Sequence, residues 1–348
     1  MKSGLALSPP LLMSKNLRSI TVIALLAAAL VALFVLLRQR RDEPRPGPAS
    51  GKLVIHFLDV GQGDSELIQL PEGQTMLIDS GDRGAPTVDL LRKYGVTQID
   101  LVIATHPHSD HIGEMKDVMR AFKVREFWDS GFNHSTRTYG DMLQEVKDEG
   151  IKFSTPKRGE TRTFGPVLIE VLNPSNELAD DNPNNASIVV RLSFGQKRFL
   201  FTGDAEMYET AAKPSAWEQM LSAEPEKLRA DLLKAAHHGS SNGTTREVLD
   251  AVRPSIMTIS CAAGNDYHHP HPRVMRMLEQ DQSHIKLYRT DLEGTITASC
   301  DGNDIEMSSD RQVAQGRLYL TGDEVAGTVA GDVRSDSAPH SRGGRRSR

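Results

Sequence analysis

Residues Leu101 to His111 read Leu-Val-Ile-Ala-Thr-His-Pro-His-Ser-Asp-His, which places three histidines and one aspartate directly after a short apolar run. The run is typical of a buried strand, so we expect the polar residues on the loop at its C-terminal end. Pro107 favours an extended conformation for His106 and disfavours a helix at that point. Because residues two apart in an extended segment point the same way, His106 and His108 are predicted to bind one metal ion.

The two remaining ligand residues of this loop, Asp110 and His111, follow the bend in the chain. They are predicted to hold a second metal ion. Imidazole and carboxylate groups together suit zinc, with manganese or iron as alternatives. A plain surface loop rarely carries so many ligand side chains, so we interpret the loop as the start of a metal centre.

A second candidate ligand ends another apolar run, Phe199 to Thr202, which is followed by Gly203 and Asp204. Gly203 allows the backbone to turn tightly after the predicted strand. A carboxylate has two oxygens, so Asp204 could bridge two metal ions. The alternative is an aspartate that caps a turn or the following helix. Beside the histidine loop, we favour the ligand.

Two adjacent histidines, His237 and His238, follow the apolar run 232–236. One of them could complete the second metal site, and the other could contact the substrate or support a ligand. The alternative is a surface pair, which is uncommon directly after a buried strand. We favour His238 as the ligand and leave the choice between the two open.

The composition is that of an ordinary globular protein, with 348 residues, 38% hydrophobic and 25% charged. The net charge of −5 gives no general attraction to nucleic acid, although a local basic groove remains compatible with it. Cys261 and Cys300 are the two cysteines of the chain, which excludes a disulfide framework and a cysteine-rich zinc module. They are expected either to form one disulfide or to stay as two buried thiols.

An uncharged run of 18 residues, 20–37, is bounded by Arg18 and Arg38. Its length predicts a single transmembrane helix, since a buried core helix is seldom apolar on every face. A signal peptide fits less well, because basic residues rather than a small-residue cleavage site follow. Basic residues on both sides leave the orientation open. We expect a single-pass membrane protein with an extracytoplasmic catalytic domain.

Four further segments flank or follow this run. Residues 1–19 form an N-terminal flank, and 38–51 form a linker rich in Pro, Arg and Gly. Residues 52–308 are the predicted folded domain. Residues 309–348 are expected to be a mostly disordered tail with a basic end.

The domain is expected to alternate short strands and helices. In the first half we expect strands at 53–58, 65–70, 75–78 and 101–104, and helices at 86–94, 113–122 and 136–149. A second strand series is expected from Lys152 onward, at 152, 167–172, 187–194, 198–202, 232–235, 256–260, 285–289 and 294–299, with helices in an insert at 206–229 and at 246–252. Two strand-rich halves predict two sheets packed face to face with helices outside.

The His-x-His-x-Asp-His motif at 106–111, with a later Gly-Asp and a later histidine, resembles the metallo-β-lactamase superfamily. Residues 77–81, Leu-Ile-Asp-Ser-Gly, look like the first motif of that family, in which Asp79 would support the metal loop. Four more segments resemble the extracellular metallohydrolase domain of the ComEC DNA-uptake proteins and related phosphodiesterases such as the phosphorylcholine esterases: 57–65, 237–240, 265–270 and 290–294.

The resemblance implies an α+β fold, a four-layer αββα sandwich with the metal site at one edge of the sheets. It implies one or two zinc ions, with Mn²⁺ as an alternative. The metal ligands it implies are His106, His108, Asp110, His111, Asp204 and His238. Asp110 and His238 then act in catalysis together with His269. The general acid could be His269 or whichever of His237 and His238 is not a metal ligand. Supporting or substrate-contacting roles are expected for Asp59, Asp64, Asp79, Asn184, Asn185, His237 and Ser240.

Two departures from the family pattern matter. The histidine usual between the first cluster and the Gly-Asp motif is missing, and Asn184 or Asn185 stands there, as in the ComEC-like subgroup. An amide oxygen binds zinc more weakly than imidazole, so the ion at His106 and His108 is expected to bind loosely. The multi-spanning channel of the ComEC proteins is also lacking, and one helix cannot form a DNA pore.

These features favour a membrane-anchored metal-dependent hydrolase. A metal-bound hydroxide would attack a phosphodiester, either DNA, in particular single-stranded DNA, or a phosphorylated envelope molecule. Two alternatives remain: a hydrolase of esters, thioesters or lactams with the same fold, and an inactive module that binds metal or DNA. The sequence names no protein partner.

Overall fold

A computed structural model of the protein describes residues 51–176, 182–207, 214–280 and 284–328. The predicted transmembrane helix at 20–37 and its flanks lie outside these ranges. None of the helices in the described ranges has both the length and the apolar composition that crossing a bilayer requires.

The first sheet has eight strands and mixes antiparallel and parallel pairs. Its strands, in spatial order, are β17 (Ile305–Ser309), β16 (Ile296–Cys300), β1 (Leu53–Phe57), β2 (Glu66–Gln69), β3 (Thr75–Ile78), β5 (Leu101–Ala104), β7 (Glu126–Asp129) and β8 (Lys152–Ser154). The pairs from β17 to β3 are antiparallel, and those from β3 to β8 are parallel.

The second sheet has seven strands: β15 (Lys286–Arg289), β14 (Ile256–Ile259), β13 (Leu232–Lys234), β12 (Lys197–Phe201), β11 (Val189–Phe194), β10 (Val167–Asn173) and β9 (Thr161–Phe164). Strands β12 to β15 run parallel to one another. The loops that follow parallel strands leave a sheet at the same edge, so the loops after β12, β13 and β14 emerge together. A separate two-stranded pair joins β4 (Gln98–Ile99) and β6 (Lys123–Val124).

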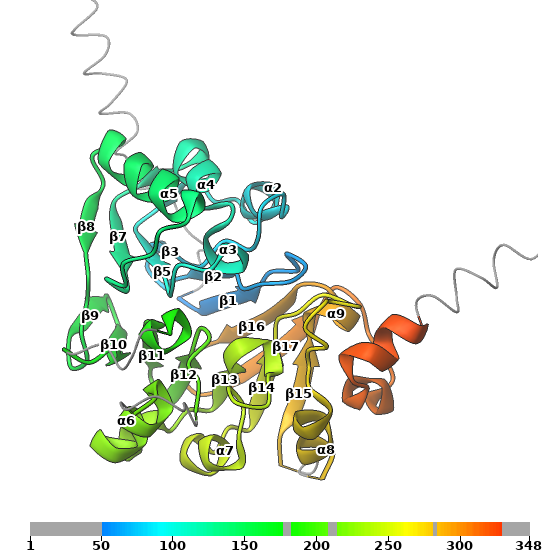
Figure 1. Ribbon diagram of the computed structural model, residues 1–348. Coiled ribbons are helices and arrows are strands. Elements are labelled where there is room, and N and C mark those ends of the chain that lie inside the picture. Colours follow the sequence, from blue (N-terminus) through cyan, green and yellow to red (C-terminus); the bar gives the residue numbers. More distant parts are fainter. Residues whose placement is uncertain (1–50, 177–181, 208–213, 281–283, 329–348) are drawn as a thin grey trace, which may run out of the picture. The chain divides into compact units, whose positions relative to one another are not determined.

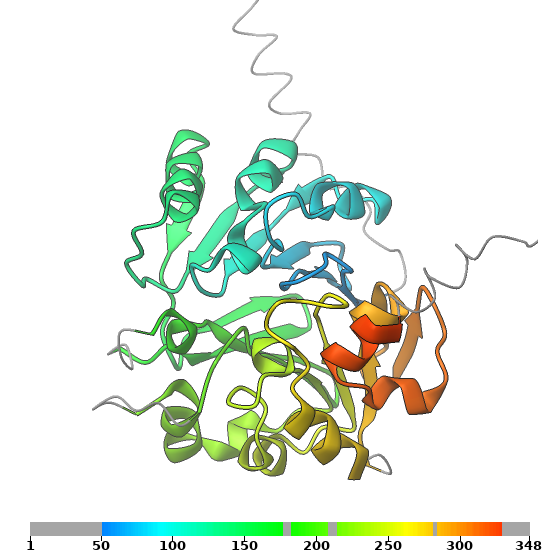
Figure 2. The ribbon, with the colours of Figure 1, turned by 45° about the vertical axis from the view of Figure 1, so that its right-hand side comes forward.

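The two sheets pack face to face on a common apolar core, in which the rings of Phe57 and Phe201 lie 6.1 Å apart. Apolar residues on the outer face of the first sheet pack on α2 (Thr87–Lys93), α4 (Met115–Ala121) and α5 (Arg137–Asp148). Those of the second sheet pack on α6 (Ala216–Ala223), α7 (Arg246–Val252) and α8 (Pro272–Gln280). Figures 1 and 2 show these four layers. The predicted αββα sandwich is confirmed.

The division of strands between the sheets differs from the expected one. Strands β8 and β16, which the sequence placed in the second series, belong to the first sheet. β16 pairs with β1 over five residues, and its buried residues Ile296, Ala298 and Cys300 face the central core. The sheet to which a strand belongs depends on its pairing partner rather than on its place in the chain. The periodicity of the sequence therefore did not reveal that β8 and β16 join the first sheet.

The elements missed altogether include β7, β9, β17 and α8, together with the short strands β4 and β6 and a short helix, Thr290–Glu293. Strand β9 reads Thr-Arg-Thr-Phe and is largely exposed, so it carries little apolar signal. The insert at 206–229 is helical only at α6 and in a short 3₁₀ helix, Pro225–Leu228, within the described residues. Cys261 and Cys300 are separate buried thiols, which excludes the disulfide alternative.

The folded part extends past the predicted boundary at residue 308. A 3₁₀ helix, Gln315–Tyr319, and a helical turn at 322–328 follow β17. The buried guanidinium of Arg289 donates hydrogen bonds to the backbone carbonyls of Leu318 and Leu320. Backbone hydrogen bonding to a buried charge orders a segment whose own sequence is mostly polar, so the expected disorder from residue 309 is wrong as far as residue 328.

Candidate metal centre

The histidine loop turns directly into the short helix α3 (Ser109–Ile112), which begins after His108. The loop at Gly63 packs against this turn. A Cβ atom at Gly63 would lie 2.0 Å from the carbonyl oxygen of Asp110, so only glycine allows this approach. The next residue, Asp64, donates its backbone N–H to the same oxygen at 3.2 Å. The Val-Gly-Gln-Gly-Asp turn therefore positions Asp110.

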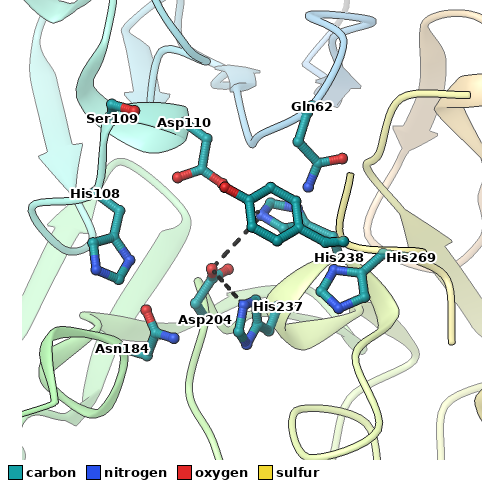
Figure 3. A pocket seen from close by; sticks show the side chains of 10 residues that line it. Gln62, His108, Ser109, Asp110, Asn184, Asp204, His237, His238 and His269 are labelled. Carbon is teal, nitrogen blue, oxygen red and sulfur yellow. Dashed lines mark hydrogen bonds and ion pairs between the residues drawn. The ribbon is translucent and has the colours of Figure 1, made fainter. Parts of the chain in front are cut away.

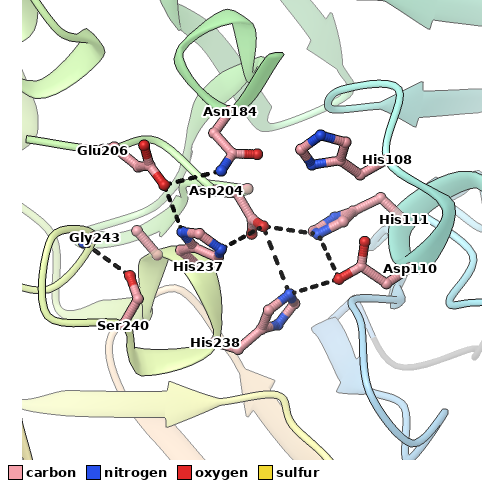
Figure 4. Close-up of polar contacts among 12 residues, drawn as sticks. His108, Asp110, His111, Asn184, Asp204, Glu206, His237, His238, Ser240 and Gly243 are labelled. Carbon is pink, nitrogen blue, oxygen red and sulfur yellow. Dashed lines mark hydrogen bonds and ion pairs between the residues drawn. The ribbon is translucent and has the colours of Figure 1, made fainter. Parts of the chain in front are cut away.

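One group of candidate ligands gathers Asp110, His111, Asp204 and His238, with one ligand atom of each within 4.8 Å of the others. His111 Nε2 lies 3.2 Å from Asp204 Oδ2, and His238 Nε2 lies 3.2 Å from Asp110 Oδ2. Figure 4 shows these side chains converging from both halves of the fold. The sequence predicted this set, and the structure brings it together.

The hydrogen bonds on the far side of these rings decide which nitrogen faces the centre. His111 Nδ1 lies 2.7 Å from Asp79 Oδ2, and His238 Nδ1 lies 2.9 Å from the carbonyl oxygen of Ser260. Both partners only accept, so each Nδ1 carries a hydrogen and each Nε2 is left to face the carboxylates. Four groups that can each act as a metal ligand therefore meet, which fits a divalent cation.

Electrostatics supports the same fit. Burial by itself lowers the pKa of His238, but the charges of Asp204 and Asp64 and its hydrogen bonds to acidic partners raise it to about 10. The pKa of His111 is also raised well above its usual value, because Asp204, Asp79 and Asp110 outweigh burial. The carboxylates thus stabilise positive charge at this point. Without a metal ion, protons on His111 and His238 supply that charge.

The other candidate pair, His106 and His108, has the opposite character. Thr105 Oγ1 donates to Asp79 Oδ2 at 2.6 Å, so it accepts from His106 Nδ1 at 3.1 Å. His106 Nε2 then faces His108 Nδ1 at 3.1 Å and Asp204 Oδ2 at 3.7 Å. Burial lowers the pKa of both histidines, which keeps them neutral and able to bind a metal.

Asp79 lies beneath both groups. Its carboxylate is fully buried and accepts from the backbone N–H and hydroxyl of Thr105 and from His111. Its backbone φ of 55° is in the left-handed region, which non-glycine residues rarely adopt. Asp79 thus contacts both ends of the histidine loop, at Thr105 and at His111.

Asp204 lies between the two groups. Its Oδ2 is within 3.2–3.7 Å of Nε2 of four histidines: His106, His111, His237 and His238. The carboxylate caps no helix, and its Oδ1 atom is buried without a hydrogen-bond partner. Burial would raise its pKa, but the charges of the surrounding histidines lower it well below its usual value. This central position is the one that a bridging ligand needs.

The adjacent histidines point to different sides of Asp204. Both adopt left-handed backbone conformations, with φ of 50° for His237 and 53° for His238. Each such residue costs about 1–3 kcal/mol, so the surrounding structure must hold the turn in place. His238 joins the group with Asp110, whereas His237 Nδ1 lies 2.8 Å from Glu206 Oε1 on the other side.

The two asparagines, Asn184 and Asn185, are also separated by the structure. Asn185 Oδ1 accepts from the backbone N–H groups of Glu206 and Ala216, so it serves the local fold. Asn184 Nδ2 donates to Glu206 Oε1 at 2.9 Å, and its buried Oδ1 has no hydrogen-bond partner. Of the two asparagines, Asn184 therefore faces the cavity over the centre.

A cavity of about 240 Å³ opens over the centre (Figure 3). Its lining residues are Gln62, His108, Ser109, Asp110, Asn184, Asp204, His237, His238, Tyr267 and His269. Burial, reinforced by His237 and His238, lowers the pKa of His269 to about 3. A neutral imidazole offers a hydrogen bond rather than a proton at neutral pH, which argues against the predicted general-acid role.

Like Asp79 and Asn185, three further predicted supporting residues lie apart from the cavity lining. Asp59 lies 3.7 Å from Arg311 at a half-buried position. Ser240 donates to Asn242 and accepts from the backbone of Gly243, so it holds its own turn. Asp64 is buried below the centre, with Oδ1 3.2 Å from His238 Nδ1.

Sequence reasoning missed the partner of Asp64. Lys234 is 1% exposed, and its Nζ donates to Asp64 Oδ2 at 2.5 Å. Burial lowers the pKa of Lys234, but the charge of Asp64 outweighs it and raises it. A lysine inside the apolar run before His237 was the available signal. Glu206 was missed as well, whereas Gln62 and Tyr267 lie inside the segments that carried the resemblance but were not named as site residues.

Comparisons with known proteins agree with this geometry. Residues 58–263 match the Metallo-beta-lactamase superfamily. The chain is 30% identical over 263 residues to ComE operon protein 3 of Bacillus subtilis (strain 168), covering 70% of this chain and 32% of that protein. It is 27% identical over 239 residues to Recombination protein 2 of Haemophilus influenzae, covering 67% and 27%. The matched part of the chain thus spans between about a quarter and a third of the length of these relatives.

Among solved structures, the metallo-beta-lactamase fold protein YhfI from Bacillus subtilis is 15% identical, with a TM-score of 0.46. The alignment covers 71% of this chain and 99% of that protein.

Proposed function

The chain belongs to the metallo-β-lactamase superfamily, and we propose that it is a metal-dependent phosphodiesterase that acts on single-stranded nucleic acid. The chain is related to competence and recombination proteins, which supports a nucleic-acid substrate. Membrane anchoring through residues 20–37, with the domain on the extracytoplasmic side, belongs to the same proposal.

The observation that carries the proposal is the position of Asp204. One carboxylate oxygen lies close to imidazoles of both ligand groups, so one side chain can connect two ions. Two divalent ions held by these residues would supply a nucleophile near neutral pH and would stabilise negative charge on phosphoryl oxygens. A nucleophile placed beside groups that stabilise charge on the phosphoryl oxygens suits attack on phosphorus with departure of an alkoxide.

Other side chains of the cavity suit a phosphodiester. The buried Gln62 Nε2 has no hydrogen-bond partner, while Gln62 Oε1 accepts from the backbone N–H of Ala262, so the amide is held with its donor side available. It can donate to a phosphoryl oxygen. Neutral His269 can donate to the leaving oxygen. Asp110 orients the attacking water through its charge.

The mouth of the cavity carries an aromatic side chain. Tyr267 is 62% exposed, and its ring lies nearly parallel to that of His269 at 6.0 Å. Asn265 holds this loop by accepting from the backbone N–H groups of Tyr267 and His269. An exposed ring on a fixed loop is a platform on which a base of a single strand can stack.

The test is turnover of labelled single-stranded DNA and of bis-p-nitrophenyl phosphate with added Zn²⁺ or Mn²⁺. We expect both to be cleaved and His108→Ala to lose most of the activity. Cleavage of nitrocefin or a thioester with no phosphodiester turnover would favour the second hydrolase class. Wild type matching His108→Ala on every substrate would favour a module without activity.

A further inference from the structure

A buried carboxylate, Glu206, lies beside the metal centre without being one of the residues that the sequence pointed to. It is 5% exposed, and it follows Asp204 by two positions on the loop after β12. Its oxygens contact Asn182 Nδ2 at 2.7 Å, Asn184 Nδ2 at 2.9 Å and His237 Nδ1 at 2.8 Å. Burying a carboxylate costs free energy unless polar groups compensate for the lost water, and these three contacts do so for Glu206. The position of Glu206 beside the centre therefore needs an explanation.

The contact with Asn184 decides how that amide is turned. A carboxylate only accepts hydrogen bonds, so Asn184 must present its NH₂ group to Glu206. Its carbonyl oxygen then points the other way, toward His108 and Asp204, as Figure 4 shows. The oxygen is buried and has no hydrogen-bond partner, although a buried acceptor normally has one.

We propose that Glu206 is a positioning residue that turns the amide oxygen of Asn184 toward the metal position of His106 and His108. This position then offers two imidazoles, the shared Asp204 carboxylate and one amide oxygen. Carbonyl and carboxylate oxygens favour harder ions such as Mn²⁺, whereas imidazole favours Zn²⁺. Both positions combine two imidazoles with two oxygen ligands, but the amide oxygen of Asn184 is neutral where the neighbouring position has the charged carboxylate of Asp110. The position beside Asn184 should therefore bind a divalent ion more weakly than its neighbour.

The same carboxylate leaves the amide oxygen of Asn184 available to a cation. The neighbouring Asn185 shows the other pattern, because its amide oxygen accepts two backbone N–H groups. Glu206 instead takes the donor side of Asn184 and leaves the acceptor side for a cation. The inference rests on the metal centre of the proposed function and not on its substrate.

Calorimetric titration of the metal-free full chain with Mn²⁺ and with Zn²⁺ separates the two positions without any measurement of turnover. For wild type we expect a tight and a weaker equivalent with either ion. Glu206→Gln should weaken only the second equivalent, by about 10–100-fold, as is usual when the support of a ligand is removed. Asn184→Ala should have the same effect while leaving Glu206 in place.

A reversed pair sharpens the test. Asn184→Asp alone puts two carboxylates 2.9 Å apart and should lower the melting temperature of the metal-free protein. In Asn184→Asp with Glu206→Gln, the glutamine can donate to the new aspartate, whose other oxygen faces the ion. We expect this double variant to bind the weaker equivalent at least as tightly as wild type.

Glu218→Gln is the control, because Glu218 caps α6 through Ser215 and contacts no ligand of the centre. It should leave both equivalents unchanged. A single equivalent in wild type, an unchanged second equivalent in Glu206→Gln and Asn184→Ala, or a double variant no better than Glu206→Gln would each overturn the proposal. Loss of DNA cleavage with normal metal binding would instead count against the proposed function alone.

Discussion

The two halves of the metal centre share Asp204 but are built differently. The half with His106, His108 and Asn184 is made of neutral groups, whose imidazole pKa values burial lowers. The half with Asp110, His111 and His238 has imidazoles whose pKa values nearby carboxylates raise. Neighbouring positions in one site can therefore differ in affinity because of the charge around the ligands, as well as through the ligands themselves.

The supports of the two halves explain the difference. Asp79 contacts both halves, through Thr105 on one side and His111 on the other. Asp64 and Lys234 lie only under the half with His238. Glu206 lies only on the side of Asn184 and His237. We therefore expect the charged half to bind its ion more tightly.

The largest effect should come from Asp204→Ala, which removes the one ligand that both halves share. Both equivalents of metal should weaken strongly. Phosphodiesterase kcat should fall by about 10³-fold, because a loss of about 4 kcal/mol of transition-state stabilisation corresponds to that factor. Metal titration and single-turnover kinetics measure the two effects. His108→Ala is the contrast, since it should weaken only one equivalent; equal losses in both variants would break the distinction between the halves.

Lys234→Met should destabilise the protein, because it leaves the buried Asp64 without its lysine partner. We expect a loss of about 3–5 kcal/mol in the free energy of unfolding, measured in urea. Asp64→Asn combined with Lys234→Met should recover most of it. Lys197→Met is the matched control, because its contact with Asp231 is partly exposed and worth about 0–1 kcal/mol. A loss as small as that of the control would show that the pair does not support the charged half.

The pH dependence should separate the halves. In the metal-free fold the pKa of His238 is raised from 6.5 to about 10, so its contribution to stability is complete below pH 6.5 and fades as pH rises toward 10. Metal must displace protons from His238 and His111, so the tight equivalent should weaken as pH falls and should release protons. The weaker equivalent should release almost none, because His106 and His108 are already neutral.

Titration in two buffers with different ionisation enthalpies measures this proton release for each equivalent. Proton release of equal size at both steps would mean that the charge difference between the halves is not the one that the structure shows.

The smallest effect should come from Tyr267→Ala, which touches neither half. Loss of one stacked base should weaken binding of a single-stranded oligonucleotide by about 1 kcal/mol, or about fivefold. Tyr267→Trp should keep the affinity. An oligonucleotide with abasic sites should bind wild type and Tyr267→Ala equally, as measured by fluorescence anisotropy in the presence of Ca²⁺. A difference with the abasic strand would assign Tyr267 a role other than stacking.

Local signals in the sequence determine the strands that carry the metal centre. The apolar runs before His106, Asp204 and His237 end as strands within a residue or two of the predicted places, because alternation and turn residues act over short distances in the chain. The ligand types of the centre were predictable for the same reason, since ligands at the ends of parallel strands converge at one edge.

Tertiary structure decided the choices between neighbours. His238 rather than His237 faces Asp110, and Asn184 rather than Asn185 faces the centre, because backbone conformation and contacts from distant elements turn adjacent side chains in opposite directions. Glu206 and Lys234 gained their roles in the same way, from partners that other loops and strands supply. A sequence pattern determines which ligands are available, whereas only packing between distant segments determines which of them point at the same ion.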